Sequence, residues 1–181
     1  MIAGEEVEQP RPKFNLGSAI ELAKKLHSVQ MSKSGLSPYI EHPLRVMEAL
    51  EPYGEDIQMV GVLHDTLEDT KLTEEQLRQL GCSEQVIEAV LALTETEGES
   101  YDDRIRRAKT NHMAKIVKLA DNLDNANEFR LARLKPDHAD YARSKYKSAR
   151  ALLFEDDPRL EDQAPLLEQR IAVLYQRDKG I

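Results

Sequence analysis

The sequence contains little cysteine and no long apolar run, and each scarcity excludes a class of protein. Cys82 is the single cysteine among 181 residues, so the chain forms no internal disulfide, and we expect it in a reducing, cytoplasmic compartment. Its thiol is expected to pack at the end of a helix. No apolar run reaches the roughly 18 residues of a membrane-spanning helix. The acidic, proline-containing residues 1–13 match neither a signal peptide nor a transit peptide.

Basic charge is scarce as well. The 25 lysines and arginines are outnumbered by 33 aspartates and glutamates, which gives a formal net charge of −8. General nucleic-acid binders need a dominant basic surface, so we expect no nucleic acid as a partner, and we expect no membrane. A small anionic ligand is still compatible with this charge if a metal ion supplies positive charge locally.

The residues that are present are typical of a soluble, folded protein, with 40% hydrophobic and 32% charged residues. Apolar residues recur with helical period along nearly the whole chain after residue 13, and period-two alternation is almost absent. We therefore predict an all-α fold with one helical bundle at residues 14–155. Residues 1–13 are predicted to be a flexible arm. Residues 156–181 are predicted to be an acidic linker and a last helix, which packs on the domain or on a partner subunit.

Local signals predict where several helices begin. These signals are capping boxes and one proline: Ser18 with Glu21, Thr73 with Gln76, Ser100 with Asp103, and Pro136. Two predicted helices carry polar motifs, one from about residue 56 through residue 70 and one from about residue 113 through residue 129. The basic run at residues 104–109 is interpreted as a solvated helix face rather than as an attractant for an anionic substrate.

The stretch VLHDTLEDT, residues 62–70, places four ionisable side chains at the end of an apolar helix. On a continuous helix His64 lies above Glu68 and Asp65 lies above Asp69, so that their polar groups converge. Ionised carboxylates against apolar neighbours are costly unless something pairs them, and few cations lie nearby in the sequence. A bound metal ion would pair them. The alternative is a solvated helix end, which is the commoner explanation for an isolated His-Asp pair.

Two further stretches add polar residues of the same kind. His42 stands at the start of the amphipathic segment EHPLRVMEAL, 22 residues before His64. Asp121 and Asn125 are four apart on a predicted helix whose other positions are mostly apolar. Taken alone, Asp121 is better explained by a capping role or by an ion pair with Lys118 or an arginine than by metal binding.

Together these stretches resemble the HD superfamily of metal-dependent phosphohydrolases. More narrowly, they are similar to the hydrolase domain of the bifunctional alarmone synthetase/hydrolases and to the small alarmone hydrolases. The resemblance covers about residues 15–155. It rests on motifs that follow one another in a fixed order: HxxQ at 27–30, KSG at 33–35, PYIxHP at 38–43, HDxxEDT at 64–70 and KLADxLxN at 118–125.

The resemblance implies one divalent ion, usually manganese, with open positions for water and a phosphate oxygen. The implied ligands are two histidines and two aspartates: His42, His64, Asp65 and Asp121. Glu68 and Asp69 are then the catalytic pair that orients or deprotonates the attacking water. The implied nucleotide-binding residues are Lys33 and Ser34 in a loop and Asn125 at the ribose.

The implied activity is hydrolysis of the 3′-pyrophosphate of guanosine tetra- or pentaphosphate, or of an adenosine analogue, with release of pyrophosphate. The sequence departs from the family in four places. Ser32 replaces an arginine that packs against the purine, so the sequence leaves the base open, and there is one extra residue between Gly35 and His42. Glu95 replaces a basic residue found in many relatives, and the usual Arg-Leu-His-Asn motif becomes Asn122-Leu123-Asp124-Asn125.

Two other functions are compatible with the sequence. One is an HD-type nucleotidase or general phosphohydrolase, because the metal centre itself does not choose a leaving group. The other is a non-catalytic module that senses a nucleotide, although such a module has no need of the Glu68-Asp69 pair. No sequence feature predicts the oligomeric state.

Overall fold

The computed structural model describes residues 13–178, and helices account for its regular structure. Within that range the β-pairing is limited to an isolated bridge between Met31 and Pro38. The prediction of an all-α fold is therefore confirmed. The predicted arm lies outside the described residues, apart from Lys13. None of the helices in the described part of the chain combines the length and the apolar character that crossing a membrane requires.

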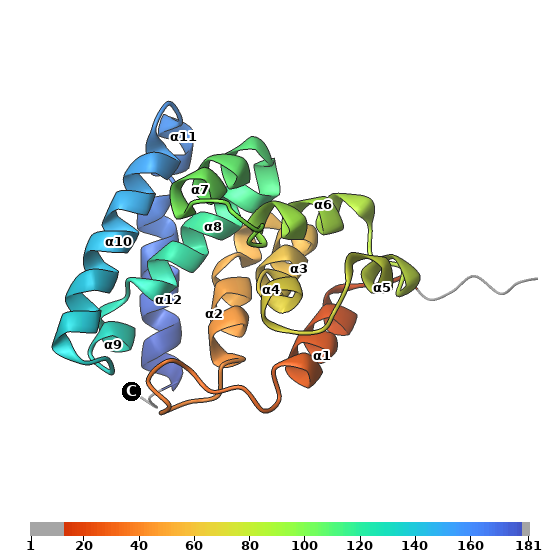
Figure 1. The fold of residues 1–181 in the computed structure, drawn as a ribbon, viewed down its shortest axis with the longest axis horizontal. Coiled ribbons are helices and arrows are strands. Elements are labelled where there is room, and N and C mark those ends of the chain that lie inside the picture. Colours follow the sequence, from red (N-terminus) through yellow and green to blue (C-terminus); the bar gives the residue numbers. More distant parts are fainter. Residues whose placement is uncertain (1–12, 179–181) are drawn as a thin grey trace, which may run out of the picture.

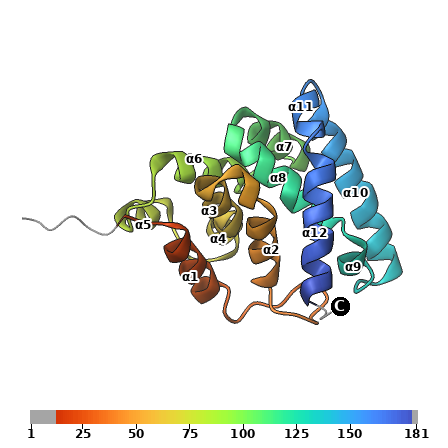
Figure 2. The same ribbon diagram turned by 180° about the vertical axis from the view of Figure 1, so that it is seen from behind.

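The helices follow one another with short connections (Figure 1). In chain order they are α1 (Leu16–Leu26), α2 (Glu41–Ala49), the 3-10 turn η1 (Glu51–Tyr53), α3 (Glu55–Leu63), α4 (Thr66–Asp69), α5 (Glu74–Gln79), α6 (Glu84–Leu93), α7 (Tyr101–Thr110), α8 (His112–Asn125), α9 (Glu128–Leu131), α10 (Pro136–Phe154), α11 (Pro158–Glu161) and α12 (Ala164–Asp178). Seen from the two opposite sides in Figures 1 and 2, α8 runs through the middle of the bundle. It packs against α2, α3, α6, α7, α10 and α12.

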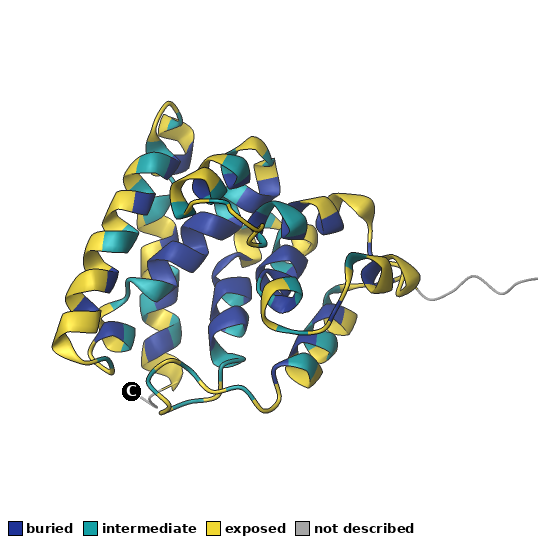
Figure 3. Cartoon of the chain, viewed as in Figure 1, coloured by how far each residue is buried: buried dark blue, intermediate teal, exposed yellow. Residues whose placement is uncertain are grey.

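The apolar side chains meet around α8, α2 and α3, where the buried residues of Figure 3 concentrate. One core cluster reaches from Phe14, before α1, to Tyr175 in α12. The C-terminal helix contributes Leu167 and Ile171 to this same core and packs on α2 and α8. Cys82 is buried after the end of α5, as predicted, and burial raises the pKa of its thiol to about 11.

Three of the four predicted helix starts are correct. Thr73 and the side chain of Gln76 exchange both hydrogen bonds of a capping box. Ser100 accepts from the backbone N–H of Asp103 at 3.2 Å, and Pro136 is the first residue of α10. The prediction at Ser18 is wrong. The cap is Asn15, whose Oδ1 accepts the backbone N–H of Ser18 at 3.0 Å, so α1 begins three residues earlier than predicted, at Leu16.

The predicted continuous helix from residue 56 through residue 70 is also wrong, because α3 ends at Leu63 and α4 begins at Thr66. Two side chains form hydrogen bonds with backbone carbonyl oxygens at the C-terminal end of α3. The imidazole Nδ1 of His64 lies 2.7 Å from the carbonyl oxygen of Gly61, and the Thr66 hydroxyl donates to the carbonyl oxygen of Leu63 at 2.7 Å. Such side-chain bonds compete with continuation of a helix, so the chain bends at the His-Asp pair.

The second predicted long helix stops early. α8 ends at Asn125, whereas the sequence predicts a helix through residue 129. Asn127 has extended backbone, and its side chain accepts the N–H of Phe129 at 3.0 Å, which caps the short helix α9. The last turn of α8 contacts both α2 and α10, because Asp124 accepts from Arg45 and Asn122 donates to the carbonyl oxygen of Tyr146.

Candidate metal centre

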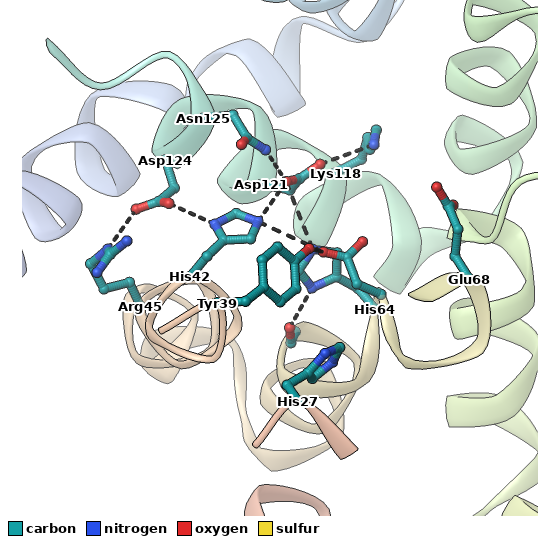
Figure 4. A network of polar contacts seen from close by, with 12 residues as sticks. His27, Tyr39, His42, Arg45, His64, Glu68, Lys118, Asp121, Asp124 and Asn125 are labelled. Carbon is teal, nitrogen blue, oxygen red and sulfur yellow. Dashed lines mark hydrogen bonds and ion pairs between the residues drawn. The ribbon is translucent and has the colours of Figure 1, made fainter. Parts of the chain in front are cut away.

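Two helices and the bend after α3 bring the four predicted metal ligands together (Figure 4). His42 lies in the first turn of α2, His64 and Asp65 form the bend, and Asp121 is on α8. Ligand atoms of His42, His64 and Asp65 all lie within 4.8 Å of one another. The Oδ1 atom of Asp121 lies 3.2 Å from Nε2 of His42 and 3.7 Å from Nε2 of His64.

Both imidazoles present Nε2 to this cluster, because each Nδ1 faces an acceptor on its other side. The acceptor for His64 is the carbonyl oxygen of Gly61. The acceptor for His42 is a carboxylate oxygen of Asp124, at 2.6 Å. Each Nδ1 must therefore carry the hydrogen, which leaves an Nε2 lone pair directed inward. Nε2 of His64 is buried and has no hydrogen-bond partner among residues 13–178, although an Asp65 oxygen lies 3.0 Å away.

The charges of the cluster call for a cation. Burial lowers the pKa of His64, but the nearby carboxylates of Asp65 and Asp121 raise it to about 9. Burial likewise opposes ionisation of Asp65, yet the charge of His64 holds the pKa of this carboxyl below its usual range. A divalent ion satisfies two imidazoles and two carboxylates together, so the residues present fit a metal ion.

Asp121 serves two partners with its two oxygens. Oδ2 accepts from the ammonium of Lys118 at 2.9 Å, which is the ion pair that the sequence offers as the alternative to metal binding. Oδ1 faces the histidines and also accepts from Asn125 at 2.5 Å. The ion pair with Lys118 therefore leaves one oxygen available, and the two explanations of Asp121 apply at the same time.

The structure separates the predicted catalytic pair. Because the helix is broken, Glu68 does not share a face with His64. It points away from the metal cluster (Figure 4). Its Oε2 atom accepts from Arg104 at 2.9 Å and from the backbone N–H of Glu95 at 3.0 Å. Asp69 in contrast feels the charge of the cluster: burial and, second, the charge of Asp65 raise the pKa of its carboxyl.

Three contacts of the centre are absent from the sequence-based prediction. Tyr39 donates its hydroxyl hydrogen to Asp65, a pairing across 26 residues that no sequence spacing indicates. The interpretation of Arg104 as part of a solvated face is wrong, because this side chain pairs with Glu68 and Glu95. Asp124 holds His42 across 82 residues, and in the sequence it stands out only as a departure from the family motif.

A cavity of about 390 Å³ opens beside the cluster, on the side of Asn125. The three predicted nucleotide-binding residues all line it: Lys33, Ser34 and Asn125. Further cationic groups come from α9, α10 and the turn between them, namely Arg130, Arg133 and Lys145. The Lys145 ammonium lies 4.2 Å from the ring centre of Tyr101. Burial and then the charges of Lys33 and Lys118 lower the pKa of Lys145, so this cavity is a place of concentrated positive charge.

The chain is similar to known proteins over this same region. The HD domain family matches residues 39–126. The guanosine-3′,5′-bis(diphosphate) 3′-pyrophosphohydrolase of Aquifex aeolicus is 33% identical over 126 residues, which are 64% of this chain and 18% of that protein. The Danio rerio protein of the same name, called MESH1, is 35% identical over 102 residues, which are 51% of this chain and 56% of that protein. The chain therefore spans only part of these relatives.

One solved structure aligns with this chain at a TM-score of 0.64 and 23% sequence identity. The alignment covers 91% of this chain and 95% of the other chain. Its description states that a metazoan ortholog of SpoT hydrolyzes ppGpp and plays a role in starvation responses. This likeness extends the shared fold to almost the whole described chain. HD domains depend on a metal, and the matched segment contains all four predicted ligands, three of which form one cluster with Asp121 beside them. The chain therefore contains an HD domain at residues 39–126.

Proposed function

We propose that this protein hydrolyses the 3′-pyrophosphate of a purine nucleotide alarmone, a guanosine tetra- or pentaphosphate or its adenosine analogue, and releases pyrophosphate. The observation that carries the proposal is a four-ligand metal cluster directly beside a cationic cavity, joined to it by Asn125. A substrate with several phosphates needs both features, because its charge must be neutralised at the scissile bond and along the remainder of the molecule.

The metal ligands in this proposal are His42, His64, Asp65 and Asp121, and the ion is manganese or another divalent metal. When bound, such an ion neutralises charge on the scissile phosphate and makes water more acidic. Tyr39 donates to Asp65 and Lys118 donates to Asp121, so each carboxylate is fixed in orientation. Gly61 and Asp124 fix the imidazoles in the same way.

Asp69 and Glu68 are the acid–base groups of the proposal, with different tasks. Asp69 has a raised pKa, and a carboxylate of raised pKa is a better acceptor for the proton of an attacking water. Glu68 is held by Arg104, which also pairs with Glu95. The ion pair holds Glu68 at the rim of the site, where it orients groups rather than accepting the first proton.

The nucleotide is held by the cationic cavity. Lys33, Arg130 and Lys145 contact its phosphates, and Asn125 contacts its ribose next to Asp121. The base lies near Ser32. The hydroxyl of this residue forms a hydrogen bond with the Ser34 hydroxyl at 3.0 Å. Since no cationic side chain at position 32 is available to stack on the base, the proposal leaves the choice between guanine and adenine open.

The test is a measurement of pyrophosphate release from guanosine and adenosine 3′-pyrophosphates, each with MnCl₂ and with EDTA. Purine 5′-monophosphates serve as controls. Mn²⁺-dependent release from either purine series supports the proposal and names the base. Phosphate release from the monophosphates alone would replace it with a nucleotidase. Binding of the 3′-pyrophosphates without turnover would replace it with a nucleotide-sensing module.

A further inference from the structure

Asp124 lies behind the metal cluster, where α8 meets α2. It is fully buried and does not face the Nε2 atoms of the ligands. Its Oδ2 atom lies 2.6 Å from Nδ1 of His42. Its Oδ1 atom accepts from Nε of Arg45 at 3.0 Å, and Arg130 donates to Oδ2 at 3.0 Å. The carboxylate therefore lies between His42 and Arg45 (Figure 4), and Arg130 adds a second guanidinium group.

These contacts fix Asp124 in position. Both oxygens of the buried carboxylate are engaged, Oδ1 by Arg45 and Oδ2 by His42 and Arg130. Arg45 is itself held in place by the ring of Tyr175, which lies 4.3 Å from its guanidinium carbon. A carboxylate held in this way can interact with His42 only by accepting the hydrogen on Nδ1.

We propose that Asp124 is a positioning residue for the metal centre: it accepts the Nδ1 hydrogen of His42 and so keeps the Nε2 lone pair of that ligand directed at the ion. The inference rests on the metal site of the proposed function. A carboxylate partner fixes the tautomer and the ring orientation of a ligating histidine and makes it a stronger ligand. His64 obtains only a carbonyl oxygen, from Gly61, so the two histidines are supported differently.

A purely structural role is the competing explanation, because Asp124 also neutralises Arg45 and Arg130 in a buried place. The two explanations differ in what they predict for His42. If Asp124 acts through His42, its loss changes the ring and the affinity for the ion. If it acts only on the arginines, its loss lowers the stability of the fold and leaves the imidazole and the ion affinity as they were.

The variant that separates them is Asp124→Asn, which keeps the shape and removes the charge. The amide can turn its NH₂ toward Nδ1 of His42, and this favours the tautomer with hydrogen on Nε2, which cannot bind an ion. We expect the affinity for Mn²⁺, measured by isothermal titration calorimetry of the whole protein with MnCl₂, to fall by about 10- to 100-fold.

The matched control is Asn122→Ala. Asn122 is also fully buried on α8, and it donates to the carbonyl oxygen of Tyr146 at 2.9 Å rather than to a ligand. Each variant is followed by urea unfolding, so that losses of stability are known. An equal fall of Mn²⁺ affinity in both variants, or an unchanged affinity in Asp124→Asn, would overturn the inference.

A second readout does not depend on the ion. Nitrogen-15 NMR of histidine-labelled, metal-free protein reports which ring nitrogen of His42 carries the hydrogen. We expect Nδ1 in the unmodified protein and a shift toward Nε2 in Asp124→Asn. A ring that is unchanged by the substitution would refute the positioning role even if the ion affinity fell.

The failure of this inference and the failure of the proposed function are distinguishable. Both readouts concern the ion and His42, and neither uses a nucleotide. If Asp124→Asn loses Mn²⁺ affinity while no 3′-pyrophosphate is hydrolysed by the unmodified protein, the inference stands and the substrate is different. If the unmodified protein binds no Mn²⁺ at all, the inference is overturned together with the metal site on which it rests.

Discussion

At the residue scale, ligands and acid–base groups contribute to different steps, and substitutions separate them. Asp65→Ala removes a carboxylate from the Nε2 cluster, so we expect it to abolish Mn²⁺ binding and turnover together. Asp69→Asn leaves all four ligands in place, and we expect it to keep Mn²⁺ affinity while kcat falls by about 10²- to 10⁴-fold. Calorimetry with MnCl₂ and pyrophosphate-release kinetics, carried out on the same preparations, measure both effects.

Glu68→Gln is the matched comparison for Asp69→Asn. The amide oxygen can still accept from Arg104, and Glu68 points away from the ligands, so we expect a smaller loss of kcat than for Asp69→Asn. Normal turnover of Asp69→Asn would contradict the assignment of this residue as the base. A larger loss in Glu68→Gln would show that Glu68, and not Asp69, accepts the proton of the attacking water.

The four proposed metal ligands follow from the order and spacing of the family motifs in the sequence, and the structure brings their side chains close together. Their support could not be predicted, because it depends on contacts between distant segments. His42 and Asp124 are 82 residues apart, and a single sequence does not record that α2 and α8 meet. In the sequence Asp124 stands out only as a departure from the family motif, whereas its carboxylate is fully committed to His42, Arg45 and Arg130.

At the element scale, the close packing of α2 on α3 sets the distance between the two histidine ligands. Gly61 lies at this contact: a Cβ atom there would come within 2.8 Å of Cδ1 of Leu50 and 3.2 Å of the Met47 Cα atom. Gly61→Ala improves helix propensity by about 1 kcal/mol, but overpacking costs about 1–3 kcal/mol. We expect a net loss of stability in urea unfolding and a weaker Mn²⁺ affinity, because His42 and His64 move apart.

Gly17→Ala provides the control for the helix-propensity term. Gly17 is in the first turn of α1, and a Cβ atom there would meet only the side chain of Asn15, at 3.3 Å. This substitution should leave Mn²⁺ affinity unchanged. Equal stability and equal Mn²⁺ affinity in Gly61→Ala and Gly17→Ala would mean that the α2–α3 contact is looser than the structure has it.

Helix starts were easier to predict than helix breaks. Thr73 with Gln76 and Ser100 with Asp103 form local hydrogen bonds within four residues, so their pattern is complete in the sequence. The break after Leu63 depends on His64 turning its ring back to Gly61, and the same residues also fit a continuous helix. The prediction therefore places the His-Asp pair and Glu68 on one face, and the bend in fact separates them.

At the scale of the whole molecule, α12 completes the core of the bundle. Leu167 is fully buried on a helix for which the sequence allows packing on the domain or on a partner subunit. We expect Leu167→Ala to lower the free energy of unfolding by about 2–5 kcal/mol, measured by urea unfolding. The exposed Val173 on the same helix is the control, and Val173→Ala should change stability by less than about 0.5 kcal/mol.

The dependence on protein concentration completes this test. If α12 packs on its own domain, the urea midpoint is the same at low and high concentration, because the unfolding of a monomer does not depend on concentration. A midpoint that rises with concentration, together with a small effect of Leu167→Ala at the lowest concentration, would instead place α12 between subunits.

The distribution of charge over the molecule sets how it meets an anionic substrate. The net charge is −8, yet the cavity gathers Lys33, Arg130 and Lys145 beside the metal cluster. A polyphosphate is attracted to this cavity only over short distances, and the Debye length falls from about 10 Å at 0.1 M salt to about 3 Å at 1 M. With Mn²⁺ held at saturation, we expect KM for the 3′-pyrophosphate to rise severalfold as NaCl increases, while kcat changes little.

Lys145 is expected to carry a measurable part of this salt dependence, because its ammonium lies among Lys33, Lys118 and Arg104 and its pKa is lowered by burial and by these charges. Lys145→Met should raise KM at low salt and flatten the rise of KM with NaCl. Lys24→Met, on the exposed face of α1, should leave both unchanged. A KM that is independent of NaCl, or equal slopes in Lys145→Met and the unmodified protein, would mean that the cavity does not receive the phosphates.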